Sequence, residues 1–123
     1  MIKVKKMIKS FGSAFRGIQT VFKTEQNFRI QILAAIAVIV LSFLLGISSW
    51  EWLVVIFLIL LVLLLEILNT VFERLVDMLK PRVHMYVYDI KNMTAAMVLI
   101  TAVSAIIIGT IIFGPKIIDL IKF

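Results

Sequence analysis

Carboxylate and amide side chains recur along one short stretch of this sequence, at the end of a long apolar run. Glu66, Asn69, Glu73 and Asp77 stand at positions i, i+3, i+7 and i+11. A helix of about 3.6 residues per turn would place all four on one face. A charged group at membrane depth costs about 2.5–3.5 kcal/mol on insertion scales, so such residues are functional hypotheses by default. The spacing therefore predicts one helix whose polar face carries the chemistry.

Further polar residues flank two other apolar segments. Glu25 stands just before one of them, and Lys91 and Asn92 open another. Hard cations such as Mg²⁺ bind carboxylate oxygens and usually keep water and phosphate oxygens as further ligands. Phosphoryl transfer requires such a metal, a cation on the phosphates and a base near the acceptor hydroxyl. Glu25, Glu66, Glu73 and Lys91 could supply these roles at one interface.

A purely structural role is open to several of these groups. Glu73 could pair with Arg74 or Lys80, and Asp77 could be solvated in a loop, because residues past the membrane edge are solvated at little cost. Glu66 is harder to explain in this way. It lies a turn or more deeper than Glu73, so it is either protonated and hydrogen-bonded or held ionised by a partner charge or a metal.

The composition indicates an integral membrane protein. Hydrophobic residues make up 63% of the 123 residues, only 16% are charged, and the mean hydropathy is +1.14. A soluble domain of this size could not bury so much apolar surface. The sequence has no cysteine, which excludes disulfides, thiolate metal sites and thiol nucleophiles. The net charge of +6 comes from basic residues beside apolar segments, which favours contact with anionic lipid and no nucleic-acid partner.

The elements that must position the polar face are four segments of a single domain over residues 1–123. Residues 2–23 repeat apolar positions at helical spacing between lysines, which predicts an amphipathic helix at the membrane interface. Residues of about 30–47, 52–73 and 93–114 are apolar enough to span a bilayer. The predicted fold class is therefore all-α, with three transmembrane helices and an N-terminal surface helix.

Two details of the spans bear on the site. The second span must continue as a helix through Asn69 and Glu73 to reach a membrane thickness of about 20 residues. Gly114 and Pro115 should end the third span, because proline cannot continue a helix.

The basic residues predict the orientation. Seven lysines and arginines precede the first span, and none lies in the turn 46–52. Four more lie between the second and third spans, namely Arg74, Lys80, Arg82 and Lys91. Basic residues concentrate on the cytoplasmic side. We therefore expect a multi-pass protein of the cell membrane with a cytoplasmic N-terminus and an external C-terminus, and with every candidate group on the side where ATP is found.

The motifs around Glu66 and Lys91 resemble those of a known family. Glu66-Ile-Leu-Asn69-Thr70-x-x-Glu73-x-x-Val-Asp77, followed by Lys91-x-x-x-Ala95-Ala96, is similar to the signature of the small prokaryotic diacylglycerol kinases and undecaprenol kinases. Ala14-x-x-Gly17 and Glu25-x-Asn27-Phe28-Arg29 also match. The resemblance implies a homotrimer of three-span subunits, each with an N-terminal surface helix and with active sites at the cytoplasmic membrane boundary. It also implies phosphorylation of a membrane lipid alcohol with Mg²⁺ and ATP.

The resemblance carries roles to individual positions. Glu66 would be the general base facing the lipid hydroxyl, and Glu25 and Glu73 would hold the metal. Lys91 would contact the nucleotide phosphates. The other matched positions would complete nucleotide binding (Asp77, Asn92 and Gly17) or support the site (Asn69 and Arg29).

Two positions depart from the family pattern. The family normally has aspartate where this sequence has Asn92, and many members carry histidine where it has Gln31. Asparagine keeps the shape of aspartate and loses the charge, which would weaken charge-assisted contacts. Asp89 lies one turn earlier and could substitute in part. A catalytically weakened or engineered member therefore stays open as an alternative.

Two further motifs bear on the lipid substrate. The Trp50-Glu51-Trp52 turn and the Phe113-Gly-Pro-Lys ending are similar to Gram-positive members, which favours undecaprenol over diacylglycerol. An alternative from another class is a non-enzymatic membrane scaffold or ion-pathway protein in which Glu66 and Glu73 line a polar route between helices.

Overall fold

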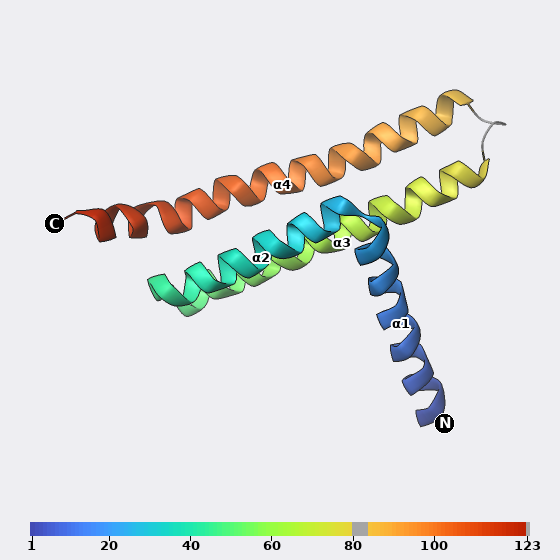
Figure 1. The fold of residues 1–123 in the computed structure, drawn as a ribbon, viewed down its shortest axis with the longest axis horizontal. Helices are drawn as coiled ribbons and strands as arrows, with labels where there is room; N and C mark the ends of the chain where they lie inside the picture. Colours follow the sequence, from blue (N-terminus) through green and yellow to red (C-terminus); the bar gives the residue numbers. More distant parts are fainter. Residues whose placement is uncertain (80–83, 123) are drawn as a thin grey trace.

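The computed structural model describes residues 1–79 and 84–122, and this part of the chain forms four α-helices. They are α1 (Val4–Thr24), α2 (Gln26–Leu45), α3 (Ser49–Leu79) and α4 (His84–Ile121). Figure 1 shows α2, α3 and α4 lying lengthwise together, while α1 leaves them at a steep angle. Helices α2, α3 and α4 are long and apolar enough to cross a membrane. The all-α architecture with three candidate spans and an additional N-terminal helix is confirmed.

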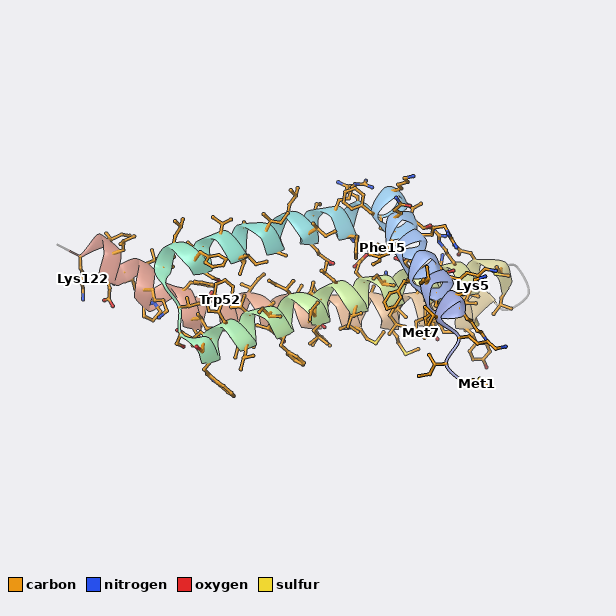
Figure 2. The ribbon with its side chains drawn as sticks, turned by 90° about the horizontal axis from the view of Figure 1, so that it is seen from below. Met1, Lys5, Met7, Phe15, Trp52 and Lys122 are labelled. Atoms are coloured by element: carbon orange, nitrogen blue, oxygen red, sulfur yellow. The ribbon has the colours of Figure 1, made fainter. Side chains whose placement is uncertain are left out.

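Helix α1 has the amphipathic character predicted for residues 2–23. Most of its large apolar side chains, Phe11 and Phe15 among them, remain exposed. In Figure 2 the labelled Lys5, Met7 and Phe15 all lie along α1 at one end of the bundle, far from Trp52. An exposed apolar stripe bordered by lysines is the pattern of a helix lying at a membrane interface.

A tight turn reverses the chain between α2 and α3. Gly46 has φ 61° and ψ 53°, a left-handed conformation that glycine adopts without a steric penalty. The backbone N–H groups of Gly46 and Ile47 donate to the carbonyls of Phe43 and Ser42 at 3.4 and 3.3 Å. These bonds close the C-terminus of α2 and send α3 back antiparallel to it.

The first turn of α3 carries a capping box that was not predicted from the sequence. The backbone N–H of Ser48 donates to Glu51 Oε1 at 3.0 Å, and the N–H of Glu51 donates to Ser48 Oγ at 3.2 Å. Such a reciprocal pair satisfies two backbone donors that have no partner within the helix. Ser48-x-x-Glu51 is the sequence signal that could have shown it.

We expect Ser48→Ala to lower the free energy of unfolding by about 1 kcal/mol, because the side-chain acceptor of the cap is lost. Equilibrium unfolding by SDS in mixed micelles, followed by circular dichroism, measures this change. Ser49→Ala is the matched control, since Ser49 is the adjacent exposed serine. Equal losses in the two variants would contradict the assignment of the cap to Ser48.

The apolar core lies near the α2–α3 turn. Ile47, Val55 and Phe113 form a buried cluster that joins this turn, α3 and α4. At the same end, Lys116 Nζ lies 3.1 Å from Glu51 Oε1, so an ion pair ties α4 to the start of α3. Most other apolar side chains of the three long helices remain exposed, as expected for surfaces that face lipid or another subunit.

The predicted end of the helix at Gly114 is wrong. Helix α4 continues through Pro115 to Ile121. A proline removes one helical hydrogen bond and crowds the residue before it. Gly114 has no Cβ, which removes part of this crowding, and the helix resumes on the far side. The helix also begins at His84, well before residue 93.

The lengths of α2 and α3 show how far the polar end of α3 extends beyond α2. Helix α2 has 20 residues, or about 30 Å, which matches the hydrocarbon thickness of a bilayer. Helix α3 has 31 residues, or about 46 Å. Its last turns therefore extend past the first residue of α2, together with the beginning of α4. Lys80 and Arg82 of the predicted cytoplasmic connection lie outside the described residues.

Candidate active site

The polar face of α3 changes from buried to exposed along the helix. Glu66 is only 1% exposed and Asn69 8%. Glu73 is half-buried and Asp77 is exposed. The predicted continuation of the helix through these positions is confirmed, because α3 runs to Leu79. The stripe thus leads from the interior of the bundle to its surface at one end.

Glu66 meets a side chain of α2. Gln31 Nε2 donates to Glu66 Oε2 at 3.3 Å. Gln31 is the sixth residue of α2, so this contact lies about 8 Å along the axis from the start of that helix. The buried carboxyl is therefore inside the depth spanned by α2, as the sequence predicted for the deepest acid of the stripe.

Asn69 and Glu73 form a second contact on the same face. Asn69 Nδ2 donates to Glu73 Oε1 at 3.3 Å, one turn along the helix. Asn69 Oδ1 is buried and has no hydrogen-bond partner among residues 1–79 and 84–122. A buried amide oxygen without a donor is costly, so this atom is suited to a group that enters the site.

Glu25 approaches the stripe from the junction of α1 and α2. It is half-buried and has an extended backbone, with φ −112° and ψ 111°. Thr24, the residue before Glu25, accepts a hydrogen bond from Arg74 at 3.1 Å, so the α1–α2 junction lies beside the end of the stripe. Glu25 and Glu73 are therefore brought to the same end of the bundle.

The oxygen atoms of the polar face are of the kind that bind Mg²⁺. No cluster of three or more histidine, cysteine or acidic side chains that could hold a metal is present in the described part of the chain. Mg²⁺ does not require one, because it is commonly held by one or two carboxylates together with water and substrate phosphates. Glu25 and Glu73 supply two carboxylates at this end of the bundle, and the buried Oδ1 of Asn69 is a further oxygen on the face that carries Glu73.

Helix α4 contributes an ion pair to the same end. Lys91 Nζ lies 2.6 Å from Asp77 Oδ1, and the two side chains are 32% and 53% exposed. Arg74, which was a possible partner of Glu73, contacts the end of α1 instead. Its guanidinium donates to Thr24 Oγ1 at 3.1 Å. The Lys91–Asp77 ion pair therefore ties the beginning of α4 to the exposed end of the stripe.

The other predicted residues lie farther out. Asn92 is exposed on α4. Gly17 is exposed on α1, with open space where a Cβ would point, so the structure does not bring it to the carboxylates. Arg29 donates to the carbonyls of Phe22 and Lys23 at 2.7 and 3.0 Å. Its guanidinium thus fixes the corner between α1 and α2, which places Glu25.

The sequence comparison adds to this geometry. Residues 12–113 match the profile of the prokaryotic diacylglycerol kinases. The chain belongs to the prokaryotic diacylglycerol kinase family. It is a membrane lipid kinase, which transfers a phosphoryl group to an alcohol, and kinase chemistry implies ATP as the donor.

Two relatives in this family differ in their named substrate. An undecaprenol kinase of Bacillus subtilis is 38% identical over 114 residues, which are 93% of this chain and 93% of the relative. A diacylglycerol kinase of Synechocystis is 32% identical over 115 residues, which are 93% of this chain and 66% of the relative. The family resemblance seen in the motifs is confirmed.

One residue of the site was not assigned a role from the sequence. Gln31 was noted only as a departure from the family pattern, yet it is the side chain that contacts the buried Glu66. A polar side chain within the apolar run of residues 30–47 was the available signal. The register between α2 and α3 decides the contact, and a single sequence does not specify that register.

Proposed function

We propose that this lipid kinase transfers the γ-phosphoryl group of ATP to the hydroxyl of undecaprenol at the cytoplasmic boundary of the membrane. The observation that carries the proposal is the buried carboxyl of Glu66, which accepts a hydrogen bond from Gln31 of α2. A lipid alcohol can reach a carboxyl at this depth from within the bilayer. An acid in this place is suited to act as a base toward it.

Undecaprenol is favoured by the comparison of relatives. The undecaprenol kinase of Bacillus subtilis shares more identity with this chain and matches it over almost its full length. The diacylglycerol kinase of Synechocystis shares less identity, and the match leaves a third of that protein uncovered. Diacylglycerol is the second candidate substrate.

In the proposed reaction, Glu66 accepts the proton of the lipid hydroxyl. The lipid oxygen forms a bond to the γ-phosphorus, and the bond from that phosphorus to the bridging β–γ oxygen breaks, which releases ADP. Because the transition state of phosphoryl transfer is loose, positioning and charge stabilisation dominate the catalysis. Glu66 supplies the positioned acceptor for the proton.

Glu25 and Glu73 would hold Mg²⁺, with Asn69 ordering the Glu73 carboxylate by its hydrogen bond. A bound Mg²⁺ would neutralise developing charge on the phosphate oxygens. Lys91 would contact the nucleotide phosphates, and Asp77 would aim its ammonium through the ion pair. Asn92 and Gly17 complete the proposed nucleotide contacts, and Arg29 supports the site through the α1–α2 corner.

We further propose that the chain acts as a homotrimer with a cytoplasmic N-terminus and an external C-terminus. The exposed apolar sides of α2, α3 and α4 leave room for packing against further subunits. The basic residues before α2 and between α3 and α4 support this orientation. The last turns of α3 and the beginning of α4 would then project into the compartment that supplies ATP.

We expect Asn92→Asp to lower the KM for ATP by about fivefold, because a charge-assisted hydrogen bond is about 1 kcal/mol stronger than a neutral one. The initial rate at several ATP concentrations measures it. Asn92→Ala serves as the control and should show no such gain. An unchanged KM and rate in Asn92→Asp would show that this position does not limit nucleotide binding.

The substrate proposal is tested by competition. Protein in vesicles that contain equal amounts of undecaprenol and diacylglycerol receives ATP labelled at the γ-phosphate and Mg²⁺. We expect most label in undecaprenyl phosphate, because the ratio of products reports the ratio of kcat/KM values. Label mainly in phosphatidic acid would contradict undecaprenol as the preferred substrate and leave the kinase assignment intact.

A further inference from the structure

The side chain of Gln31 carries two observations that the proposed roles do not use. Its amide nitrogen donates to Glu66 Oε2 at 3.3 Å. Its amide oxygen is buried and has no hydrogen-bond partner in the described ranges 1–79 and 84–122. The amide nitrogen of Gln31 therefore binds the proposed base, while the amide oxygen can still accept a hydrogen bond.

We infer that Gln31 positions the catalytic carboxylate and receives the lipid hydroxyl, with its nitrogen holding Glu66 Oε2 and its oxygen accepting the hydrogen bond of the incoming alcohol. The inference rests on the proposed function, since it concerns the same base and the same acceptor lipid. It adds a residue from α2 to a site otherwise built by Glu25 and by residues of α3 and α4.

The donor end acts on the geometry of the base. A carboxyl group can present either oxygen and can rotate, so a fixed hydrogen bond to one oxygen leaves the other oriented for proton transfer. The same logic applies to bases that are oriented by a third group in other enzymes. Gln31 and Glu66 lie on different helices, α2 and α3, so the contact also fixes the base relative to the bundle.

The acceptor end acts on the substrate. An alcohol has one donor hydrogen, and at this place it meets two acceptors, the oxygen of Gln31 and the carboxylate of Glu66. On arrival the hydroxyl donates to Gln31 Oε1, which satisfies the buried oxygen. As the lipid oxygen attacks phosphorus, the same proton passes to Glu66. Bound lipid would therefore supply a donor to an oxygen that has no partner among residues 1–79 and 84–122.

The test compares Gln31→Met with Gln31→His. Methionine has a similar length and neither donates nor accepts strongly, whereas neutral histidine keeps one donor and one acceptor. We expect Gln31→Met to lower kcat by about 10–100-fold, the range typical of a lost orienting contact. The KM for lipid should rise and the KM for ATP should stay unchanged. Gln31→His should retain kcat within about threefold of the wild type, a much smaller change than the one expected for Gln31→Met.

A structural role alone would give a different result. A partly unfolded variant would have a smaller active fraction, which lowers kcat without changing the KM for lipid. Gln26→Met is the matched control, because Gln26 is an exposed glutamine of the same helix. It should behave as the wild type.

A second measurement separates action through Glu66 from an independent effect. In the Glu66→Gln background, Gln31→Met should lower the residual kcat little further, because residues that act as a unit are not additive. Full additivity would overturn the positioning role, and so would wild-type kinetics of Gln31→Met in an active enzyme. Absence of lipid phosphorylation by the wild type would instead contradict the proposed function, and the inference with it.

Discussion

Replacing Glu66 by glutamine is expected to lower the rate of lipid phosphorylation by about 10²–10⁴-fold, the usual contribution of a general base. The amide has the shape of the carboxyl and can still bond to Gln31, so folding and assembly should be preserved. It cannot accept the proton of the lipid hydroxyl. The measurement is the initial rate of transfer from labelled ATP to undecaprenol in vesicles, at saturating ATP and Mg²⁺.

The control for Glu66→Gln is on the same helix. Glu51→Gln removes a carboxylate at the opposite end of α3, where it caps Ser48 and pairs with Lys116. This variant should keep the wild-type rate constant at a temperature where it is folded. A Glu66→Gln enzyme with the rate of the Glu51→Gln enzyme would refute the assignment of the base.

Replacing Glu73 by glutamine is expected to raise the Mg²⁺ concentration for half-maximal activity by about 10–100-fold, because a carboxylate beside the metal is lost. The amide oxygen can still accept the hydrogen bond from Asn69, so the local structure should be retained. The measurement is the rate as a function of free Mg²⁺ at fixed ATP. High Mg²⁺ should restore part of the activity.

Glu25→Gln should shift the Mg²⁺ dependence in the same direction, since it is the proposed second carboxylate of the metal site. Asp119→Asn is the control for general charge effects, because Asp119 is an exposed acid near the far end of α4. An unchanged Mg²⁺ dependence in both glutamate variants would remove them from the metal site, whatever their effect on the maximal rate.

The spacing of residues along one helix was enough to predict the polar face of α3. Helical periodicity decides which side chains share a face, so the burial of Glu66 and the continuation of the helix past Glu73 followed from the sequence. The hydrogen bond between Asn69 and Glu73 is the one-turn contact that this periodicity allows.

Contacts between helices could not be predicted in the same way. The bonds of Gln31 to Glu66 and of Lys91 to Asp77 depend on the register and rotation of neighbouring helices. Composition and periodicity do not fix these quantities, because many registers bury similar apolar area. The family resemblance named Lys91 and Asp77 separately, but their pairing came from the structure.

The end of α4 shows the limit of a local rule. Proline after glycine usually marks the end of a helix, yet α4 continues through Pro115. Lys116, the next residue, forms the ion pair with Glu51, and the following turn is completed by the backbone bond from Lys122 to Ile118 at 3.0 Å. Tertiary contact and the missing Cβ of Gly114 outweigh the local preference here.

The role of Glu66 is tested most sharply by the transfer of labelled γ-phosphate to undecaprenol by the purified chain in vesicles, with wild type and Glu66→Gln measured side by side. We expect Mg²⁺-dependent formation of undecaprenyl phosphate by the wild type and a rate lower by about 10²–10⁴-fold for the variant. Equal rates for the two proteins would contradict the central claim that the buried carboxyl of α3 is the base of this lipid kinase.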